Sequence, residues 1–255
     1  MEKTSLGGRC MTYKFNAEKT THELIQWIRE WFEKNGTSCN AIIGISGGKD
    51  SSVVAALCVA ALGKNRVIGI KMPNGYQPDE EDADSIIQHL GIRGYRIDIA
   101  NAYDAIIDQV ENVAIHPSNQ SVINLAPRLR MSVLYCMAQS LNGRVSNNSN
   151  LSERYIGYST RWGDSVGDFA PLANLTVQEV IAIGKVLGLP SKLIEKTPAD
   201  GLSKKTDEET FGFTYDELDK YIRTGSCANE NTVKQIKTKH EKNRFKLSSI
   251  PMFQP

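Results

Sequence analysis

Apolar residues recur along this chain at two different spacings, which predict alternating helices and strands. Near the N-terminus, Leu24, Ile28 and Phe32 recur as on one face of an amphipathic helix that ends at Asn35-Gly36. Strands are predicted over residues 41–45, 66–71, 94–99 and 144–146, and helices over residues 18–34, 53–62, 80–90, 120–142, 177–187, 214–221 and 231–246. This alternation predicts an α/β fold with a doubly wound, mostly parallel sheet flanked by helices.

Two helix starts carry a further local signal. Thr176 with Glu179, and Thr214 with Glu217, match the capping box, in which the two side chains satisfy backbone N–H groups of the first turn. A polar, glycine-rich segment follows the last predicted strand, over residues 147–168. We therefore predict helices at the two boxes and leave the segment 147–168 without a regular element.

The most informative segment is residues 46–52, with the sequence SGGKDSS, which joins the first predicted strand to the following helix. Adjacent glycines let the backbone pass close to an anion, and the start of the helix adds its N–H groups and the positive end of its dipole. Asp50 would repel a bare phosphate at this place. Its presence indicates that a cation, most simply Mg²⁺, lies between carboxylate and phosphate, so the loop predicts an Mg-nucleotide site.

This loop differs from the common P-loop, in which a Gly-Lys-Ser/Thr ending provides a lysine for the outer phosphates and a hydroxyl for the metal. Here Asp50 stands where the hydroxyl residue would be. The pattern resembles instead the loop of ATP-dependent ligases that cleave ATP between the α and β phosphates and release pyrophosphate. Such enzymes form adenylates.

Length, charge and cysteine content exclude several classes of protein. The 255 residues suffice for one large domain, for which we expect residues 17–255, preceded by an N-terminal extension over residues 1–16. Thirty basic and 29 acidic residues leave a formal charge of +1, which gives no electrostatic case for nucleic acid as a partner. The five cysteines are scattered and lack the spacing of a zinc site. Without an apolar run near 18 residues, we expect a soluble cytoplasmic protein with no membrane partner.

Beyond the loop, the chain resembles the ammonia-dependent NAD synthetases from about residue 20 to the C-terminus. Four stretches carry the resemblance: residues 44–51 (GISGGKDS), 124–131 (NLAPRLRM), 152–164 (SERYIGYSTRWGD) and 197–202 (TPADGL). The first is shared with other enzymes that cleave ATP to AMP and pyrophosphate, and the last three are specific. The resemblance implies an adenine nucleotide alpha-hydrolase-like, Rossmann-like fold.

The resemblance also implies a reaction. Members of the family join ATP, deamido-NAD and ammonia to give NAD, AMP and pyrophosphate through an adenylated carboxylate. By resemblance, Asp50 and Glu153 are the catalytic acids and hold Mg²⁺. The ATP-binding residues would be Gly44, Ile45, Ser46, Gly47, Gly48, Lys49, Asp50 and Ser51.

Deamido-NAD carries two phosphates and a carboxylate, so its pocket should contain basic side chains. By resemblance these are Arg128, Arg161 and Lys246, with Asp168 accepting a hydrogen bond from a ribose hydroxyl or a similar donor. The family also implies a homodimer. The nitrogen source would be free ammonia, or ammonia delivered by a separate partner.

Three positions depart from the family. Val177 stands where many members have a lysine that reaches the ATP phosphates, Ala199 where many have serine or threonine, and Asn148 where threonine is frequent. Either other lysines neutralise the phosphates, with Lys185, Lys204 and Lys205 as candidates, or the ATP site is weakened. The alternatives are an ATP-binding sensor, or another adenylating ligase of the same superfamily, such as a tRNA-thiolating enzyme.

Overall fold

The centre of the molecule is a four-stranded parallel sheet. The computed structural model describes residues 13–77, 80–196 and 206–254. The strands are β1 (Asn40–Gly44), β2 (Val67–Lys71), β3 (Arg93–Arg96) and β4 (Gly143–Val145), in the order β3-β2-β1-β4. In the register of the sheet, Ile42 of β1 pairs with Ile68 on one side and with Val145 on the other. The predicted doubly wound parallel sheet is confirmed.

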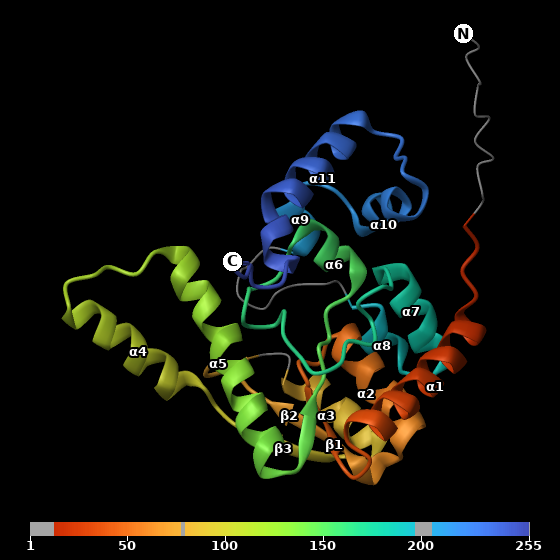
Figure 1. The fold of residues 1–255 in the computed structure, drawn as a ribbon, viewed down its shortest axis with the longest axis horizontal. Coiled ribbons are helices and arrows are strands. Elements are labelled where there is room, and N and C mark those ends of the chain that lie inside the picture. The colour runs from red at the N-terminus through yellow and green to blue at the C-terminus, as the bar shows by residue number, and fades with distance from the viewer. Residues whose placement is uncertain (1–12, 78–79, 197–205, 255) are drawn as a thin grey trace.

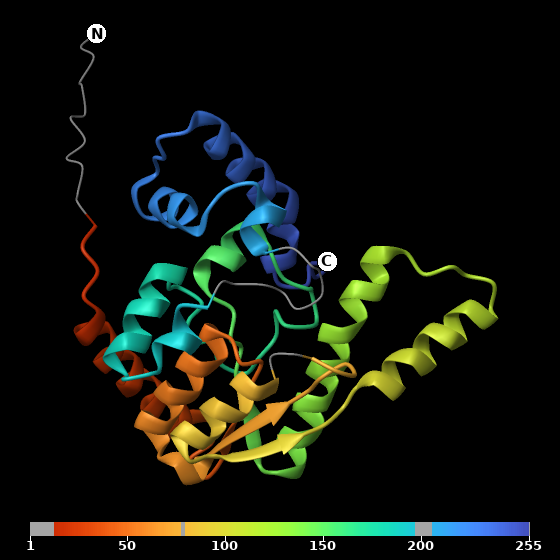
Figure 2. The same ribbon diagram turned by 180° about the vertical axis from the view of Figure 1, so that it is seen from behind.

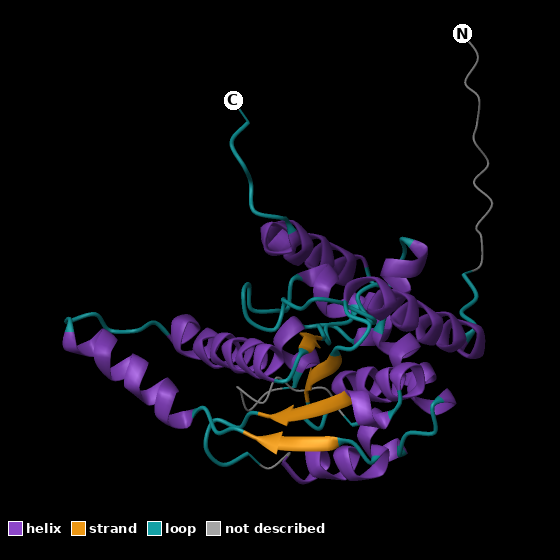
Figure 3. Ribbon diagram, turned by 60° about the horizontal axis from the view of Figure 1, so that its bottom comes forward, coloured by secondary structure: helices purple, strands orange, loops and turns teal. Residues whose placement is uncertain are grey.

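Helices pack on both sides of this sheet (Figure 3). The α-helices are α1 (Ala17–Asn35), α2 (Lys49–Leu62), α3 (Glu80–Leu90), α4 (Ala100–Asn112), α5 (Asn119–Ser140), α6 (Leu151–Ile156), α7 (Val177–Val186), α8 (Ser191–Ile194), α9 (Asp207–Phe211), α10 (Tyr215–Thr224) and α11 (Glu230–Asn243). Two short 3-10 helices are η1 (Lys64–Arg66) and η2 (Arg244–Leu247). No helix within the described ranges is both long and apolar enough to cross a membrane.

The two faces of the sheet bury separate apolar clusters because successive side chains of a strand point to opposite faces. Ala41 and Ile43 of β1 join the cluster under α1, α2 and α7, and Ile42 between them joins the cluster under α5. All three side chains are fully buried. β1 is therefore the central strand, and the loop that follows it starts from a rigid base.

A third apolar cluster holds together the C-terminal part of the chain. It is formed by α6, α7, α9, α10 and α11, whose buried residues include Ile156, Phe211, Leu218 and Ile236. Figure 1 shows these helices gathered on one side of the sheet, with the C-terminus beside them. This C-terminal helical lobe faces the loops that follow β1 and β4, as the hydrogen bonds below establish.

The helices α4 and α5 form a hairpin whose far end projects away from the rest of the fold (Figures 1 and 2). α5 packs on β1 and β4, but α4 has no buried residue and carries the exposed side chain of Ile106. Val113 and Ile115, in the connection between the two helices, are also largely exposed.

Most of the predicted elements are confirmed, but the short helices α8 and α9 were not predicted, and β3 ends at Arg96 where the prediction ran to residue 99. Three further differences concern α2, α6 and α4. α2 begins at Lys49 and not at residue 53, because its first turn is polar and faces the candidate site. The segment 147–168 contains α6, which opens with a capping box between Asn150 and Glu153. No element was predicted for α4, because its apolar residues have no core beneath them.

Candidate active site

The candidate site lies where the order of the strands reverses. Chain order runs from β1 outward to β2 and β3, and β4 then lies on the other side of β1. In doubly wound sheets, loops that leave two such neighbouring strands diverge and open a crevice at their carboxyl ends. Here the crevice lies between residues 45–48, after β1, and residues 146–150, after β4. Asn148 joins the two loops, since its Nδ2 donates to the Gly44 carbonyl oxygen at 3.0 Å.

The glycine loop after β1 presents backbone donors at the start of α2. Gly47 has a φ of +81°, in the left-handed region that glycine adopts without strain. Gly48 is the N-cap of α2, and within the described part of the chain no side chain caps this helix start. The Ser51 and Ser52 hydroxyls instead donate to the Gly48 carbonyl oxygen at 3.1 and 2.8 Å. The free N–H groups of the first turn therefore remain available to an anion.

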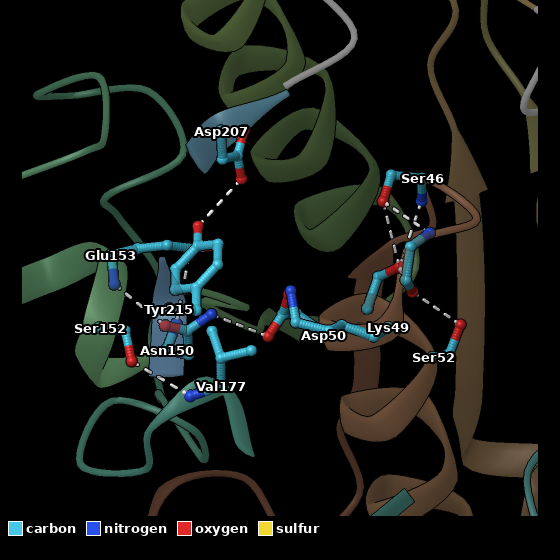
Figure 4. Close-up of polar contacts among 12 residues, drawn as sticks. Ser46, Lys49, Asp50, Ser52, Asn150, Ser152, Glu153, Val177, Asp207 and Tyr215 are labelled. Carbon is cyan, nitrogen blue, oxygen red and sulfur yellow. Dashed lines mark hydrogen bonds and ion pairs between the residues drawn. The ribbon is translucent and has the colours of Figure 1, made fainter. Parts of the chain in front are cut away.

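Asp50 and Glu153, which are far apart in the sequence, are joined through one asparagine. Asn150 is fully buried, and its Nδ2 donates to Asp50 Oδ1 at 3.0 Å. Its Oδ1 accepts from the backbone N–H of Glu153 at 3.0 Å, and Glu153 Oε2 accepts from the Asn150 N–H at 3.4 Å. Figure 4 shows this bridge from α2 to α6 across the crevice. The capping box of α6 thus also positions both candidate acids.

Lys49 is the basic side chain of this cluster. It is only 5% exposed, and its Nζ lies 2.9 Å from Asp50 Oδ2. Burial lowers the pKa of a lysine, but the negative charges of Asp50, Glu153 and Asp207 outweigh burial and raise the pKa of Lys49. The ammonium group also lies 5.7 Å from the centre of the Tyr215 ring. Lys49 is therefore a charged lysine enclosed by acids.

Glu153 is the carboxyl group of this cluster whose proton affinity is raised. Burial, and then the negative charge of Asp50, raises the pKa of Glu153 to about 8. Behind it, the Tyr215 hydroxyl donates to Asp207 Oδ2 at 2.9 Å, and both of these side chains are buried. Burial raises the pKa of Tyr215 strongly, so the phenol stays protonated. A cation bound at Asp50 and Glu153 would add positive charge beside these acids.

The donor chemistry at Asp50 and Glu153 fits Mg²⁺. Across residues 13–77, 80–196 and 206–254, no three His, Cys, Asp or Glu side chains come together as a metal site. Mg²⁺ in nucleotide enzymes is commonly held by one or two carboxylates, with phosphate oxygens and water completing its shell. The pair formed by Asp50 and Glu153, beside a loop that presents N–H groups, meets that requirement.

The first two backbone N–H groups of α7 already donate hydrogen bonds to side chains of the protein. The Asp219 carboxylate accepts from the Ser152 hydroxyl at 2.5 Å and from the Gln178 N–H at 2.9 Å, and Ser152 Oγ accepts from the Val177 N–H at 3.1 Å. The Val177 side chain is 2% exposed and belongs to the apolar cluster of the C-terminal helical lobe. Position 177 is therefore core in this chain.

Of the other lysine candidates, only Lys185 lies among the described residues, and it does not join the cluster. Lys185, near the far end of α7, pairs with Glu195 at 2.7 Å and is 56% exposed. Ala199, Lys204 and Lys205 lie outside the described residues, as do residues 197–202 of the fourth motif. Asn148 accepts from the Ser146 hydroxyl at 2.8 Å through its Oδ1, and thus helps to hold the two loops together.

The three basic residues predicted for the dinucleotide meet at the loop over residues 157–164, which follows α6. Arg128 of α5 donates from Nε to the Arg161 carbonyl oxygen at 3.4 Å. Lys246 of η2 donates to the carbonyl oxygens of Gly157 and Ser159 at 2.9 and 3.1 Å. The tertiary structure therefore brings together residues from two separate motifs and from η2.

Arg161 itself is held between two aromatic rings. Its guanidinium lies 4.8 Å from the centre of the Trp162 ring and 5.5 Å from that of Phe245. Its Nε is buried and has no hydrogen-bond partner among the described residues. Burial and the charge of Lys242 lower the pKa of Lys246. This basic group leaves donors for an anionic ligand.

Asp168 lies apart from these three residues. Its Oδ2 accepts from the Val145 N–H at 2.7 Å, at the end of β4, and its Oδ1 accepts from the Tyr135 hydroxyl at 3.5 Å. The hydrogen bond to Oδ2 therefore fixes the end of β4. Asp168 remains a predicted ligand residue, at the β4 side of the crevice.

Three members of the cluster were not assigned from the sequence: Asn150, Asp207 and Tyr215. For Asn150 the sequence holds a signal, because the Asn-x-x-Glu spacing of Asn150 and Glu153 is a capping signature. Asp207 follows Thr206, an N-cap that accepts from the Glu209 N–H at 3.2 Å. Nothing local indicates that the start of this short helix faces Lys49.

Similarity to known proteins extends over most of this chain. The model of the NAD synthase family matches residues 20–250. The NH(3)-dependent NAD(+) synthetase of Carboxydothermus hydrogenoformans is 38% identical over 244 residues, which is 94% of this chain and 99% of that protein.

Two solved structures share the fold over nearly the whole chain. The NMN synthetase of Francisella tularensis has a TM-score of 0.86 at 31% identity, covering 94% of this chain and 100% of that one. The NH3-dependent NAD synthetase of Campylobacter jejuni has a TM-score of 0.77 at 29% identity, again over 94% and 100%. The resemblance seen in the sequence motifs is confirmed, and this chain belongs to the NAD synthase family.

Proposed function

We propose that this chain is an ammonia-dependent NAD synthetase, a ligase that forms a C–N bond. A nicotinate carboxylate oxygen of deamido-NAD attacks the α phosphorus of ATP, and the bond to the β-phosphate oxygen breaks to release pyrophosphate. Ammonia then attacks the carbonyl carbon of the adenylate, AMP leaves, and the nitrogen loses a proton to give the amide. The observation that carries this proposal is the Asn150 bridge, which joins Asp50 to Glu153 beside the glycine loop.

The residues of the cluster have distinct proposed roles. Backbone N–H groups of residues 46–51 bind the phosphates, because the start of α2 has no side-chain cap among the described residues. Asp50 and Glu153 hold Mg²⁺, which would neutralise charge on the phosphates. Asn150 fixes the separation of the two acids through two hydrogen bonds of 3.0 Å. Preorganised donors of this kind lower the barrier because they need not reorient during the reaction.

We assign the basic group around the loop 157–164 to the acidic dinucleotide. Arg161, with a buried Nε lacking a partner among the described residues, is placed to bind a phosphate or the nicotinate carboxylate. Arg128 is exposed and contacts the same loop through Arg161. Lys246 already donates to two backbone carbonyls. We therefore propose that it holds the loop 157–164 in its conformation and also adds positive charge there. Asp168 would accept from a ribose hydroxyl at the β4 side.

A second candidate substrate is nicotinate mononucleotide, whose amidation would give NMN. The specific observation is the TM-score of 0.86 to an NMN synthetase, against 0.77 to the Campylobacter NAD synthetase. Both substrates present the same nicotinate carboxylate to the same ATP site. They differ in the adenylate half, which only the dinucleotide carries.

We further propose that residues 17–255 form one catalytic domain and that two copies associate through the α4–α5 hairpin. α4 has no buried residue, and the exposed fractions of Ile106, Val113, Ile115 and Ile123 are 40, 67, 59 and 38%. A second copy would cover this apolar surface. Because the reaction consumes ATP and the four described cysteines are free thiols, we place the enzyme in the cytoplasm.

The test is a reaction with each component omitted in turn. Purified protein is incubated with ATP, Mg²⁺, ammonium and either deamido-NAD or nicotinate mononucleotide, and the amide product, AMP and pyrophosphate are measured. Synthesis that requires all four components, with a larger kcat/KM for deamido-NAD, supports the main proposal. A larger kcat/KM for the mononucleotide supports the second candidate. ATP binding without pyrophosphate release from either substrate would identify a sensor instead.

A further inference from the structure

Lys49 occupies the position at which a cation would meet Asp50. Its Nζ lies 2.9 Å from Asp50 Oδ2, while Asn150 donates to Oδ1 of the same carboxylate at 3.0 Å. Both oxygens of Asp50 are thus engaged by donors from the protein (Figure 4). A divalent ion that binds Oδ2 would lie close to the ammonium group, and the repulsion between the two positive charges favours displacement of the lysine.

The surroundings of Lys49 are those of a cation-binding position. Three carboxyl groups, on Asp50, Glu153 and Asp207, act on its charge, and the Tyr215 ring lies 5.7 Å away. Burying a lysine costs several kcal/mol of hydration free energy, which such acids offset.

Lys49 also lies close to the proposed phosphate site. It is the first residue of α2 and directly follows Gly48, so its backbone belongs to the loop that would hold the phosphates. A lysine side chain is long and has rotatable bonds throughout, so the ammonium can leave Asp50 and still remain beside that loop.

We propose that Lys49 is a positioning residue that takes the place of the divalent cation at Asp50 in the nucleotide-free protein. When the Mg-nucleotide binds, the ammonium moves from Asp50 to the phosphates and the metal takes its place. This role rests on the proposed function, since it needs a metal at Asp50. It makes binding of the metal and of the nucleotide mutually dependent.

The experiment measures Mn²⁺ binding, by electron paramagnetic resonance of the free ion, with and without ATP. The variants are Lys49→Met and Lys49→Gln, and the matched control is Lys185→Met, which removes the same charge from the exposed pair with Glu195. We expect the wild type and the control to bind Mn²⁺ weakly without ATP. Both Lys49 variants should bind it at least tenfold more tightly without ATP and show a higher KM for ATP. A Mn²⁺ affinity of the Lys49 variants no tighter than that of the wild type overturns the proposal.

Loss of Lys49 leaves buried acids without a counter-charge, so thermal unfolding is followed as a second measurement. A melting temperature that falls in EDTA and recovers with Mn²⁺ supports the proposal, because the metal then replaces the lysine. A melting temperature that falls equally with and without Mn²⁺ indicates a purely structural ion pair and overturns it.

Adding Asp50→Asn to Lys49→Gln separates this inference from the proposed function. Tight Mn²⁺ binding should disappear in the double variant. If it survives, the metal lies elsewhere, and the assignment of the metal to Asp50 fails together with the role of Lys49. If the wild type makes NAD with metal binding that depends on Asp50, but Lys49 has no effect, only the role of Lys49 fails.

Discussion

At the scale of single residues, the candidate site is organised by Asn150. This one buried amide binds Asp50 through its nitrogen and the first turn of α6 through its oxygen. Two acids are held close together, and the pKa of Glu153 is raised to about 8 in consequence of burial and of the charge on Asp50. Acids with strongly shifted pKa values occur often at functional sites. Holding two such acids close together lowers the stability of the folded protein.

That cost predicts a dependence of stability on pH. Unfolded Glu153 loses its proton near 4.5, whereas folded Glu153 keeps it to about 8. Between these values the folded state binds more protons, so the free energy of unfolding falls as pH rises, by ~1 kcal/mol per pH unit at most. In Glu153→Gln this fall should be smaller between pH 5 and pH 8. Urea unfolding in EDTA at several pH values measures it, and identical pH profiles would contradict the raised pKa.

Asp50→Asn tests the metal assignment. Asp50 lies at the junction of the glycine loop and α2, with an 18% exposed side chain. The amide keeps the size of the side chain, so we expect the variant to fold. Turnover should fall roughly a hundredfold or more, because a neutral ligand holds Mg²⁺ poorly. Asp84→Asn, which removes an exposed acid paired with Lys71, is the matched control and should retain activity. Near-normal turnover of Asp50→Asn would rule out this acid as a metal ligand.

At the scale of elements, three helices of the C-terminal helical lobe are joined to one another by a buried carboxylate. Asp219 of α10 accepts from Ser152 of α6 and from the Gln178 N–H of α7. Burial raises the pKa of Asp219, while the two donors lower it. Three helices therefore meet at one side chain, behind the acids of the candidate site.

Asp219→Ala should destabilise the protein by about 2 to 4 kcal/mol, because two buried donors lose their acceptor. The matched control is Asp216→Ala on the same helix, whose carboxylate accepts from the exposed Gln178 side chain at 2.7 Å. It should change the free energy of unfolding by less than about 1 kcal/mol. Urea denaturation of both variants provides the measurement. Equal losses of unfolding free energy in the two variants would show that Asp219 does not hold these helices together.

At the scale of the whole molecule, the α4–α5 hairpin is the part whose apolar side chains stay exposed to solvent. Helices that pack on only one side keep their other face exposed, and α4 lacks even one buried residue. A hairpin of this kind gains a second apolar surface when it meets its own copy, and symmetric pairing is the commonest arrangement of oligomers.

The dimer proposal predicts a change of mass in solution. Wild-type protein should sediment at twice the chain mass of 28.2 kDa. The double variant Ile106→Asp with Ile123→Asp should sediment as a monomer, because burying these charges in the interface costs more free energy than association provides. Val186→Asp places the same charge on an exposed valine of α7 and should remain dimeric. A wild-type monomer, or a double variant that stays dimeric, would contradict the proposed interface.

The sequence by itself determined the elements and the first half of the candidate site. Apolar spacing located the four strands, because a central strand such as β1 must bury both of its faces. Residues 46–52 identified the glycine loop because strand, glycines and helix start are adjacent in the chain. Motifs separated by long stretches still identified the family, since the last three of them are specific to it.

Only the tertiary structure decided which side chains meet. Lys49 reads as an ordinary loop lysine, yet folding places it among acids from α2, α6 and α9. Position 177 became core because the lobe packs Val177 against Phe211 and Leu218. Local spacing cannot specify such contacts, because they depend on how distant helices pack against one another and on the electrostatic interactions between groups that this packing buries together.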